Sequence, residues 1–257
     1  MSVRHRLIPS LLLRRGRLVK GVSYAAHRDA GHPVGTARAH NAQGADELML
    51  IDIDASGEAR EPDLDALRAV AAVTFVPLTF GGGIATAATA RACIASGADK
   101  VMVTAAALDR PALIDELSHT LGIQAVVLGL DLTRDQQGQR RLYDHRRRDV
   151  HPGRDWKAWI KEAVDRGAGE IRVMAVDREG RRAGLDLDLH AEIQDLTRVP
   201  IILEGGAGTL KHLDDAFAAG IMAAGLGTML VFSDNNIFKL KQFLGARGHL
   251  VRRLESA

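Results

Sequence analysis

Short runs of apolar residues alternate along this chain with longer segments in which apolar residues recur at helical spacing. An unbroken apolar run is typical of a strand in a parallel sheet buried on both faces, and the longer spacing is typical of an amphipathic helix. The predicted strands are residues 7–13, 48–53, 76–80, 101–104, 125–130, 171–176, 201–204 and 223–226. The predicted helices are residues 34–43, 64–73, 86–96, 111–121, 155–166, 187–196, 210–219 and 237–246. Because these units follow one another without a linker, we predict one α/β domain over residues 1–257, a (β/α)8 TIM barrel, with an open doubly wound sheet as the alternative.

An internal repeat divides the chain into two halves. The matching segments are Gly44-Ala45-Asp46-Glu47-Leu48 with Gly167-Ala168-Gly169-Glu170-Ile171, Gly81-Gly82-Gly83 with Gly205-Gly206-Ala207, and Thr104 with Thr228. Each pair is offset by 123 or 124 positions. This offset predicts two four-unit halves related by a pseudo-twofold axis, with equivalent groups on opposite sides of one barrel mouth. A remnant of ancestry without present function is the alternative.

Composition narrows the class of partner. The 34 basic and 32 acidic residues leave a net charge of +2, which excludes nucleic acid or an anionic membrane as a mainly electrostatic partner. Cys93 is the single cysteine, and the longest uncharged run, residues 220–233, is too short for a membrane span. With no secretion signal recognised, we expect a cytoplasmic protein. The histidines lack metal-ligand spacing, so we expect no metal and no cofactor. The basic stretch 140–154 predicts a solvated loop or hairpin, with a contact to a substrate phosphate or a partner as the alternative.

Glycines and threonines follow the strands of both halves. Gly82 and Gly83 follow the third strand, Gly205 and Gly206 follow the seventh, and Thr104, Gly227 and Thr228 lie at the ends of the fourth and eighth. Glycine lets backbone N–H groups approach an anion, and the helix that follows adds positive potential. We therefore predict two phosphate sites and a phosphorylated small-molecule substrate. Tight turns that need glycine for their own geometry are the alternative.

Four aspartates lie at the carboxyl ends of predicted strands: Asp52, Asp54, Asp131 and Asp177. Active sites of such barrels lie at this end, where a carboxylate can act as a general acid or base. An aspartate in this position is also a common helix cap or turn residue. Four of them around one mouth favour roles in catalysis or substrate binding.

The order and spacing of several motifs resemble one known family over nearly the whole chain. The motifs are Arg6-Leu7-Ile8-Pro9, Gly16-Arg17-Leu18-Val19-Lys20-Gly21, Arg28-Asp29-Ala30-Gly31, Gly81-Gly82-Gly83-Ile84, Gly97-Ala98-Asp99-Lys100-Val101, Asp177-Arg178-Glu179-Gly180 and Gly205-Gly206-Ala207-Gly208. The chain resembles the cyclase subunit of imidazole glycerol phosphate synthase, which takes ammonia from a glutaminase partner. The resemblance implies an ammonia gate of Arg6, Glu47, Lys100 and Glu170, and a glutaminase interface around Asp99. A structural ring of ion pairs is the alternative to the gate, and both require mutual contacts.

The chain departs from this family at a catalytic position. The family uses two aspartates, of which the second matches Asp131, whereas the first falls on Leu12, and an aliphatic side chain cannot transfer protons. Thr104, Met174 and Glu204 also differ from the usual residues. We therefore expect a divergent branch that uses channelled ammonia on a nucleotide-linked or phosphorylated sugar for surface polysaccharide. Asp131 would act as acid or base, Asp177 as a second carboxylate and Lys20 as a contact to phosphate.

Two alternatives to sugar amidation remain open. The first is the ordinary cyclase of histidine biosynthesis, tolerating Leu12. The second is a catalytically inert scaffold that activates a glutaminase. An isomerase on the same barrel is disfavoured, because an isomerase needs no ammonia gate.

Overall fold

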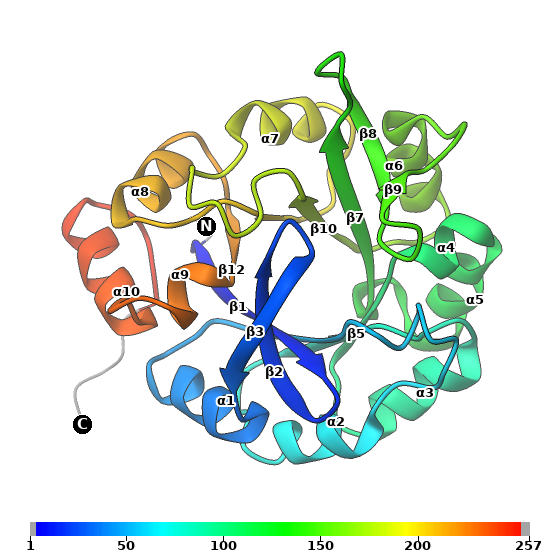
Figure 1. The fold of residues 1–257 in the computed structure, drawn as a ribbon, viewed down its shortest axis with the longest axis horizontal. Coiled ribbons are helices and arrows are strands. Elements are labelled where there is room, and N and C mark those ends of the chain that lie inside the picture. Colours follow the sequence, from blue (N-terminus) through cyan, green and yellow to red (C-terminus); the bar gives the residue numbers. More distant parts are fainter. Residues whose placement is uncertain (1–3, 253–257) are drawn as a thin grey trace.

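The apolar runs form strands that close into a barrel. In the computed structural model, which describes residues 4–252, the barrel strands are β1 (Arg6–Arg14), β4 (Leu48–Asp52), β5 (Leu78–Gly81), β6 (Lys100–Val103), β7 (Val126–Arg134), β10 (Glu170–Ala175), β11 (Ile201–Glu204) and β12 (Ala223–Leu226). Neighbours in this order pair in parallel, and β12 pairs in parallel with β1. The predicted barrel is therefore confirmed and the open sheet is wrong, because each of the eight strands has a parallel partner on both sides and no edge strand remains among them (Figure 1).

Helices surround the barrel where helical spacing predicts them. They are α1 (Pro33–Ala42), α2 (Leu64–Ala71), α3 (Ala87–Ala95), α5 (Ala112–Leu121), α6 (Trp156–Asp165), α7 (Leu187–Gln194), α8 (Leu210–Ala218) and α10 (Ile237–Ala246). Several begin at a side chain that accepts a hydrogen bond from the first turn: Asp63, Thr86, Asp155, Asp186, Thr209 and Asn236. These caps satisfy backbone N–H groups that have no partner within the helix, which explains why each helix begins there.

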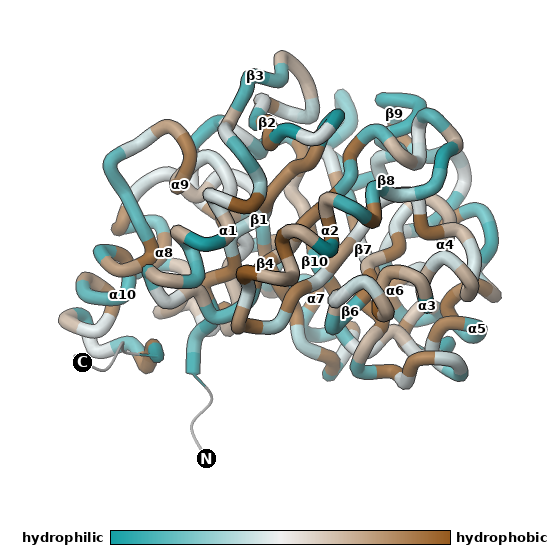
Figure 2. Tube along the Cα trace, turned by 90° about the horizontal axis from the view of Figure 1, so that it is seen from below, coloured by the Kyte–Doolittle hydropathy of each residue, from teal (hydrophilic) through white to brown (hydrophobic). Residues whose placement is uncertain are grey.

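Two hairpins extend the barrel at the carboxyl ends of its strands. The first, β2 (Arg17–Val22) and β3 (Ala25–Gly31), follows β1, and the second, β8 (Arg140–Asp144) and β9 (Asp149–Val150), follows β7. The second is the hairpin allowed for residues 140–154, whereas the first was not predicted, because β3 is mostly exposed and has no apolar period. The β2–β3 hairpin crosses one end of the barrel (Figure 1), and β2, β3 and β9 share that end (Figure 2).

Short elements complete the chain. They are α4 (Ala105–Asp109), the 3-10 turn η1 (Ile123–Ala125) and α9 (Thr228–Val231). The prediction that residues 1–257 form one domain extends beyond the described residues at both ends, and it stays a prediction.

The buried apolar residues form two separate clusters. The larger lies between the strands and the helices and includes Cys93 and both tryptophans. The smaller consists of Ile8, Met49, Ile202 and Ala223, which are fully buried and come from β1, β4, β11 and β12. In the ring of strands β5 lies opposite β11, and β6 lies opposite β12, which is the arrangement that the repeat predicted. Equivalent loops of the two halves therefore face each other across the mouth.

Candidate active site

A cavity of ≈ 140 Å³ opens at the carboxyl ends of the strands. Of the residues singled out in the sequence, the cavity is lined by Leu12, Asp52, Asp54, Gly82, Gly83, Thr104, Asp131 and Met174. Sequence reasoning missed Tyr24 and His27 from the β2–β3 hairpin, Arg172 from β10, and Arg14. His145 and Arg148, from the basic stretch 140–154, also line the cavity. The mouth of the barrel thus combines the first half's loops with cationic and aromatic groups from the two hairpins.

A second, much smaller cavity of ≈ 10 Å³ lies beside the equivalent loops of the second half. Lys20 lines it together with Gly205, Gly206, Gly227 and Thr228, so the structure brings these predicted residues together. The ammonium group of Lys20 is buried in an ion pair with Glu179. Its charge is therefore already balanced by Glu179.

The glycines of both loops are required by the backbone itself. Gly82 has a φ of 95° and Gly206 a φ of 98°. A Cβ on Gly82 would lie 2.0 Å from the carbonyl oxygen of Asp52, and one on Gly206 would lie 2.2 Å from that of Gly184. Because steric fit alone explains these glycines, they do not distinguish a phosphate site from a tight turn. Both phosphate sites stay predictions.

Asp131 is the centre of a buried polar network. Its Oδ1 accepts hydrogen bonds from the hydroxyl of Tyr24 at 2.8 Å and from Nη1 of Arg172 at 3.1 Å. Nδ1 of His145 lies 3.7 Å from Oδ2. Burial alone would raise the pKa of Asp131, but His145 and Arg172 outweigh burial and hold that pKa below its usual value. Asp131 is therefore a carboxylate at neutral pH and can accept a proton.

Glu204 does not stand free beside the second loop. Its Oε2 accepts a hydrogen bond from Nε of Arg172 at 2.9 Å, so one guanidinium joins Glu204 to Asp131. Glu204 also lines the second cavity, where its charge is unfavourable for a phosphate. The signal for Arg172 was available in the sequence, because it is a charged residue inside an otherwise apolar predicted strand.

The other three predicted aspartates differ from Asp131. Asp52 pairs in bidentate fashion with Arg60, at 2.7 Å and 2.8 Å, and Asp54 accepts a hydrogen bond from Nε of Arg14 at 2.9 Å. Asp177 lines neither cavity, and its role as a second carboxylate stays a prediction.

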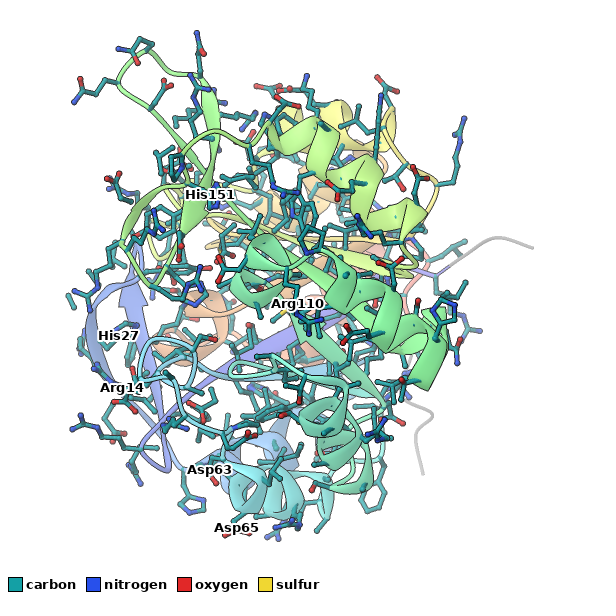
Figure 3. All side chains as sticks on the ribbon, turned by 90° about the vertical axis from the view of Figure 1, so that its right-hand side faces the viewer. Arg14, His27, Asp63, Asp65, Arg110 and His151 are labelled. Carbon is teal, nitrogen blue, oxygen red and sulfur yellow. The ribbon has the colours of Figure 1, made fainter. Side chains whose placement is uncertain are left out.

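The side of the open cavity near β1 and β3 is lined by an arginine that is paired with Asp54. Arg14 and His27 lie close together in Figure 3, and both line the cavity. Burial and the neighbouring Arg14 lower the pKa of His27. His27 is therefore neutral at physiological pH, and the positive charge of Arg14 is balanced by Asp54.

The opposite end of the barrel is closed by four charged side chains. Arg6 pairs with both Glu47 and Glu170, and Nζ of Lys100 lies 3.0 Å from Glu47 and 2.7 Å from Glu170. Cations and anions therefore alternate around the ring. Although burial lowers it, the two glutamates raise the pKa of Lys100, so Lys100 is a cation at neutral pH. The mutual contacts that both a gate and a structural ring require are present.

Over residues 4–252, no group of three or more His, Cys, Asp or Glu side chains is placed to hold a metal ion. No helix described by the structure is long and apolar enough to cross a membrane.

The closed parallel barrel, with its polar cavity at the carboxyl ends of the strands, defines the class of TIM-barrel enzymes. The family model described as "Histidine biosynthesis protein" matches residues 6–236, and the chain belongs to this family. It is 42% identical over 251 residues to imidazole glycerol phosphate synthase subunit HisF of Anoxybacillus flavithermus, covering 96% of this chain and 98% of the relative. It is 40% identical over 257 residues to the protein of the same name from Kineococcus radiotolerans, covering 98% and 100%. The expected resemblance to the cyclase subunit is therefore confirmed.

Proposed function

We propose that this chain is the ammonia-using synthase subunit of a glutamine amidotransferase complex of the imidazole glycerol phosphate synthase type. One observation carries the proposal: a closed ring of charged side chains lies at one end of the barrel and the Asp131 cavity at the other. Between them lies the apolar interior cluster of Ile8, Met49, Ile202 and Ala223. An apolar interior admits neutral ammonia more readily than ammonium or hydroxide, because burial of an unpaired ion is costly.

A glutaminase subunit is the proposed partner at the ring end. Phe75 precedes β5 and is 85% exposed, and Ile123 in η1 precedes β7 and is 59% exposed. Asp99, which precedes β6, accepts a hydrogen bond from the backbone N–H of Leu78 at 2.8 Å and is itself exposed. Exposed apolar side chains beside an oriented carboxylate are suited to a protein interface. All three residues lie at the amino ends of the strands, where ammonia would enter.

The relatives favour the reaction of histidine biosynthesis over the sugar amidation expected from Leu12. Near-full-length relatives at about 40% identity carry the name of imidazole glycerol phosphate synthase. We therefore place the cyclase reaction on a phosphorylated ribulosyl substrate first. Amidation of a nucleotide-linked sugar comes second, because Leu12 lines the cavity in place of a carboxylate and Glu204 lies beside the second loop.

Turnover with free ammonium tests the proposal and separates the two substrates. The purified chain is incubated with ammonium and either the bisphosphorylated ribulosyl compound or a nucleotide sugar, and product is identified by mass spectrometry. Imidazole glycerol phosphate formed by the wild type supports the first substrate. No such product from the wild type, with activity gained by Leu12→Asp, contradicts it. If Asp131→Asn leaves product formation in the glutaminase complex unchanged, the chain is a scaffold and the proposal is wrong.

The ring has its own test in the complex with the glutaminase. Lys100→Ala removes one cation between Glu47 and Glu170. We expect glutamine-driven turnover to change more than ammonium-driven turnover, because only the former requires passage through the ring. Equal effects on both would mean that the ring is structural.

A further inference from the structure

The β2–β3 hairpin, which the hydrophobic pattern did not predict, brings Tyr24 to Asp131. Tyr24 lies in the turn between β2 and β3, and its hydroxyl donates a hydrogen bond to Oδ1 of Asp131 at 2.8 Å across 107 positions of sequence. Resting on the proposed function, we infer that Tyr24 is a second proton-transfer residue of this site, which works with Asp131 in place of the carboxylate that Leu12 lacks.

The hairpin holds Tyr24 at some cost in backbone strain. Ser23, Tyr24 and Ala26 have φ values of 47°, 61° and 50°, a region that L-residues rarely occupy. This backbone region is strained for L-residues, so surrounding contacts must enforce the conformation. Strain of this kind is typical of functional sites.

The enforcing contacts come from the turn that follows β10. The backbone N–H of Ser23 donates to the carbonyl of Glu179 at 3.0 Å, and the side chain of Glu179 pairs with Lys20. Gly180 lies against the hairpin so closely that a Cβ there would be 2.8 Å from the Cα of Val22. These contacts hold the hairpin over the mouth of the barrel. The side chain of Tyr24 therefore has a defined position, unlike an exposed loop side chain.

Leu12 explains why the site needs this hydroxyl. It lines the same cavity as Tyr24 and Asp131, and it pairs with Val19 at the start of the hairpin. An aliphatic side chain there leaves Asp131 without a second carboxylate at the end of β1. Tyr24 belongs to the hairpin that follows this strand and presents a hydroxyl directly to Asp131.

The protonation states of the pair define how it works. Burial, followed by the charge of Asp131, raises the pKa of Tyr24 well above its usual value, whereas the pKa of Asp131 is lowered. Tyr24 is therefore a neutral phenol and does not act as a phenolate base. Asp131 takes a proton from one substrate atom, and the phenol gives its own proton to a second substrate atom while it receives the proton held by Asp131. The carboxylate and the phenol are both restored, and no further reactant is needed.

Two other side chains, Arg172 and His145, lie close enough to Asp131 to be considered for the role of Tyr24. Arg172 donates to Oδ1 from β10 and carries no removable proton at neutral pH. His145, from the segment after β8, lies 3.7 Å from Oδ2 and is the competing proton carrier. Because His145 lies farther from Asp131 than the Tyr24 hydroxyl does, we rank it second as a proton carrier. The variant His145→Gln measures its contribution to turnover.

The test compares Tyr24→Phe with Tyr143→Phe in ammonium-driven turnover. The Tyr143 ring packs against Tyr24 with 5.9 Å between centroids but does not line the cavity, so this variant is the matched control. We expect Tyr24→Phe to lower kcat about 100-fold with KM unchanged and to lose the solvent deuterium isotope effect on kcat. Tyr143→Phe should stay within about threefold of the wild type. A similarly small effect of Tyr24→Phe, or a larger loss in His145→Gln, overturns the inference.

A rescue experiment separates proton transfer from mere closure of the mouth. The double variant Tyr24→Phe/Leu12→Asp carries a carboxylate at the end of β1. Its kcat should be at least tenfold higher than that of Tyr24→Phe. If it is not, and if KM has risen in Tyr24→Phe, Tyr24 only shapes the cavity and the inference is wrong.

Failure of the proposed function is recognised separately. If the wild type makes no product from either substrate, the proposed function is wrong, whereas the Tyr24 contact is still measured by titrating ¹³C-labelled aspartate by NMR. Loss of the phenol donor should raise the pKa of Asp131 in Tyr24→Phe but not in Tyr143→Phe. A raised pKa of Asp131 in Tyr24→Phe supports Tyr24 as the partner of the catalytic carboxylate. An unchanged pKa overturns the role proposed for Tyr24.

Discussion

Arg172 is expected to be a major determinant of stability at the barrel mouth. Its Nε lies 2.9 Å from Glu204 and its Nη1 lies 3.1 Å from Asp131, and each of the three side chains is at most 5% exposed. Arg172→Met leaves both carboxylates buried without their cation. We expect the free energy of unfolding at pH 7 to fall by about 3–5 kcal/mol, the usual cost of removing one partner from a buried ion pair.

The magnitude follows from the two opposing terms. At a charge separation of about 4 Å and an effective dielectric constant of about 20, each carboxylate gains about 4 kcal/mol from the guanidinium. This gain offsets the several kcal/mol that each buried ion loses in leaving water. Without Arg172 the penalty stays and the attraction is lost, until the carboxylates take up protons. Proton uptake limits the loss, which is why the expected value is below the sum of the two attractions.

The pH dependence has a definite sign. In the wild type the pKa of Asp131 is lowered, so its contribution to stability is present above the ordinary aspartate pKa and is lost as pH falls through the lowered value. In Arg172→Met the carboxylates bind protons more readily in the folded state. The difference in stability between the two proteins should therefore be largest near pH 7 and shrink towards pH 4.

Urea unfolding at several pH values measures this effect through the transition midpoint at an unchanged m-value. Arg172→Met/Glu204→Met removes one of the two unpaired carboxylates and should recover at least half of the loss. Arg141→Met is the control, because Arg141 is about half exposed in its pair with Asp135 and should change stability by less than about 1 kcal/mol. A loss below about 1 kcal/mol in Arg172→Met, or no recovery in the double variant, would refute the reasoning.

Three further predictions concern other parts of the molecule. Asp186→Asn keeps a cap for α7 but loses the ion pair with Arg140 at 2.6 Å, so urea unfolding should show about 2–3 kcal/mol less stability at pH 7. The pKa of Asp186 is lowered, so this difference should vanish as pH falls through that value, and its persistence in acid would contradict the assignment. Phe75→Ser should weaken binding of the glutaminase about tenfold by calorimetry without changing Tm, because Phe75 is 85% exposed in the isolated chain. Burial raises the pKa of Cys93 to about 11, so a thiol reagent at pH 8 should modify the native protein far more slowly than the urea-unfolded chain; equal rates would show that Cys93 is accessible.

The sequence by itself determined the barrel and the location of its mouth. Hydrophobic periodicity is a local property, and each apolar run forms a barrel strand within a few residues of its predicted ends. The same pattern marked Asp131, Thr104 and the glycine loops as residues at the carboxyl ends of strands. The ring of Arg6, Glu47, Lys100 and Glu170 was also predicted, through the resemblance to the cyclase family.

Only the tertiary structure decided which of these charged groups are paired with another side chain and which are left to act on a substrate. Lys20, expected to contact phosphate, is paired with Glu179 across 159 positions, and Glu204 is joined to Asp131 through Arg172. The polar β2–β3 hairpin has no apolar period, so nothing local predicted that Tyr24 reaches Asp131. Ion pairs and hydrogen bonds form between groups that closure of the barrel brings together, and their partners are set by distance in space, which hydrophobic periodicity does not encode.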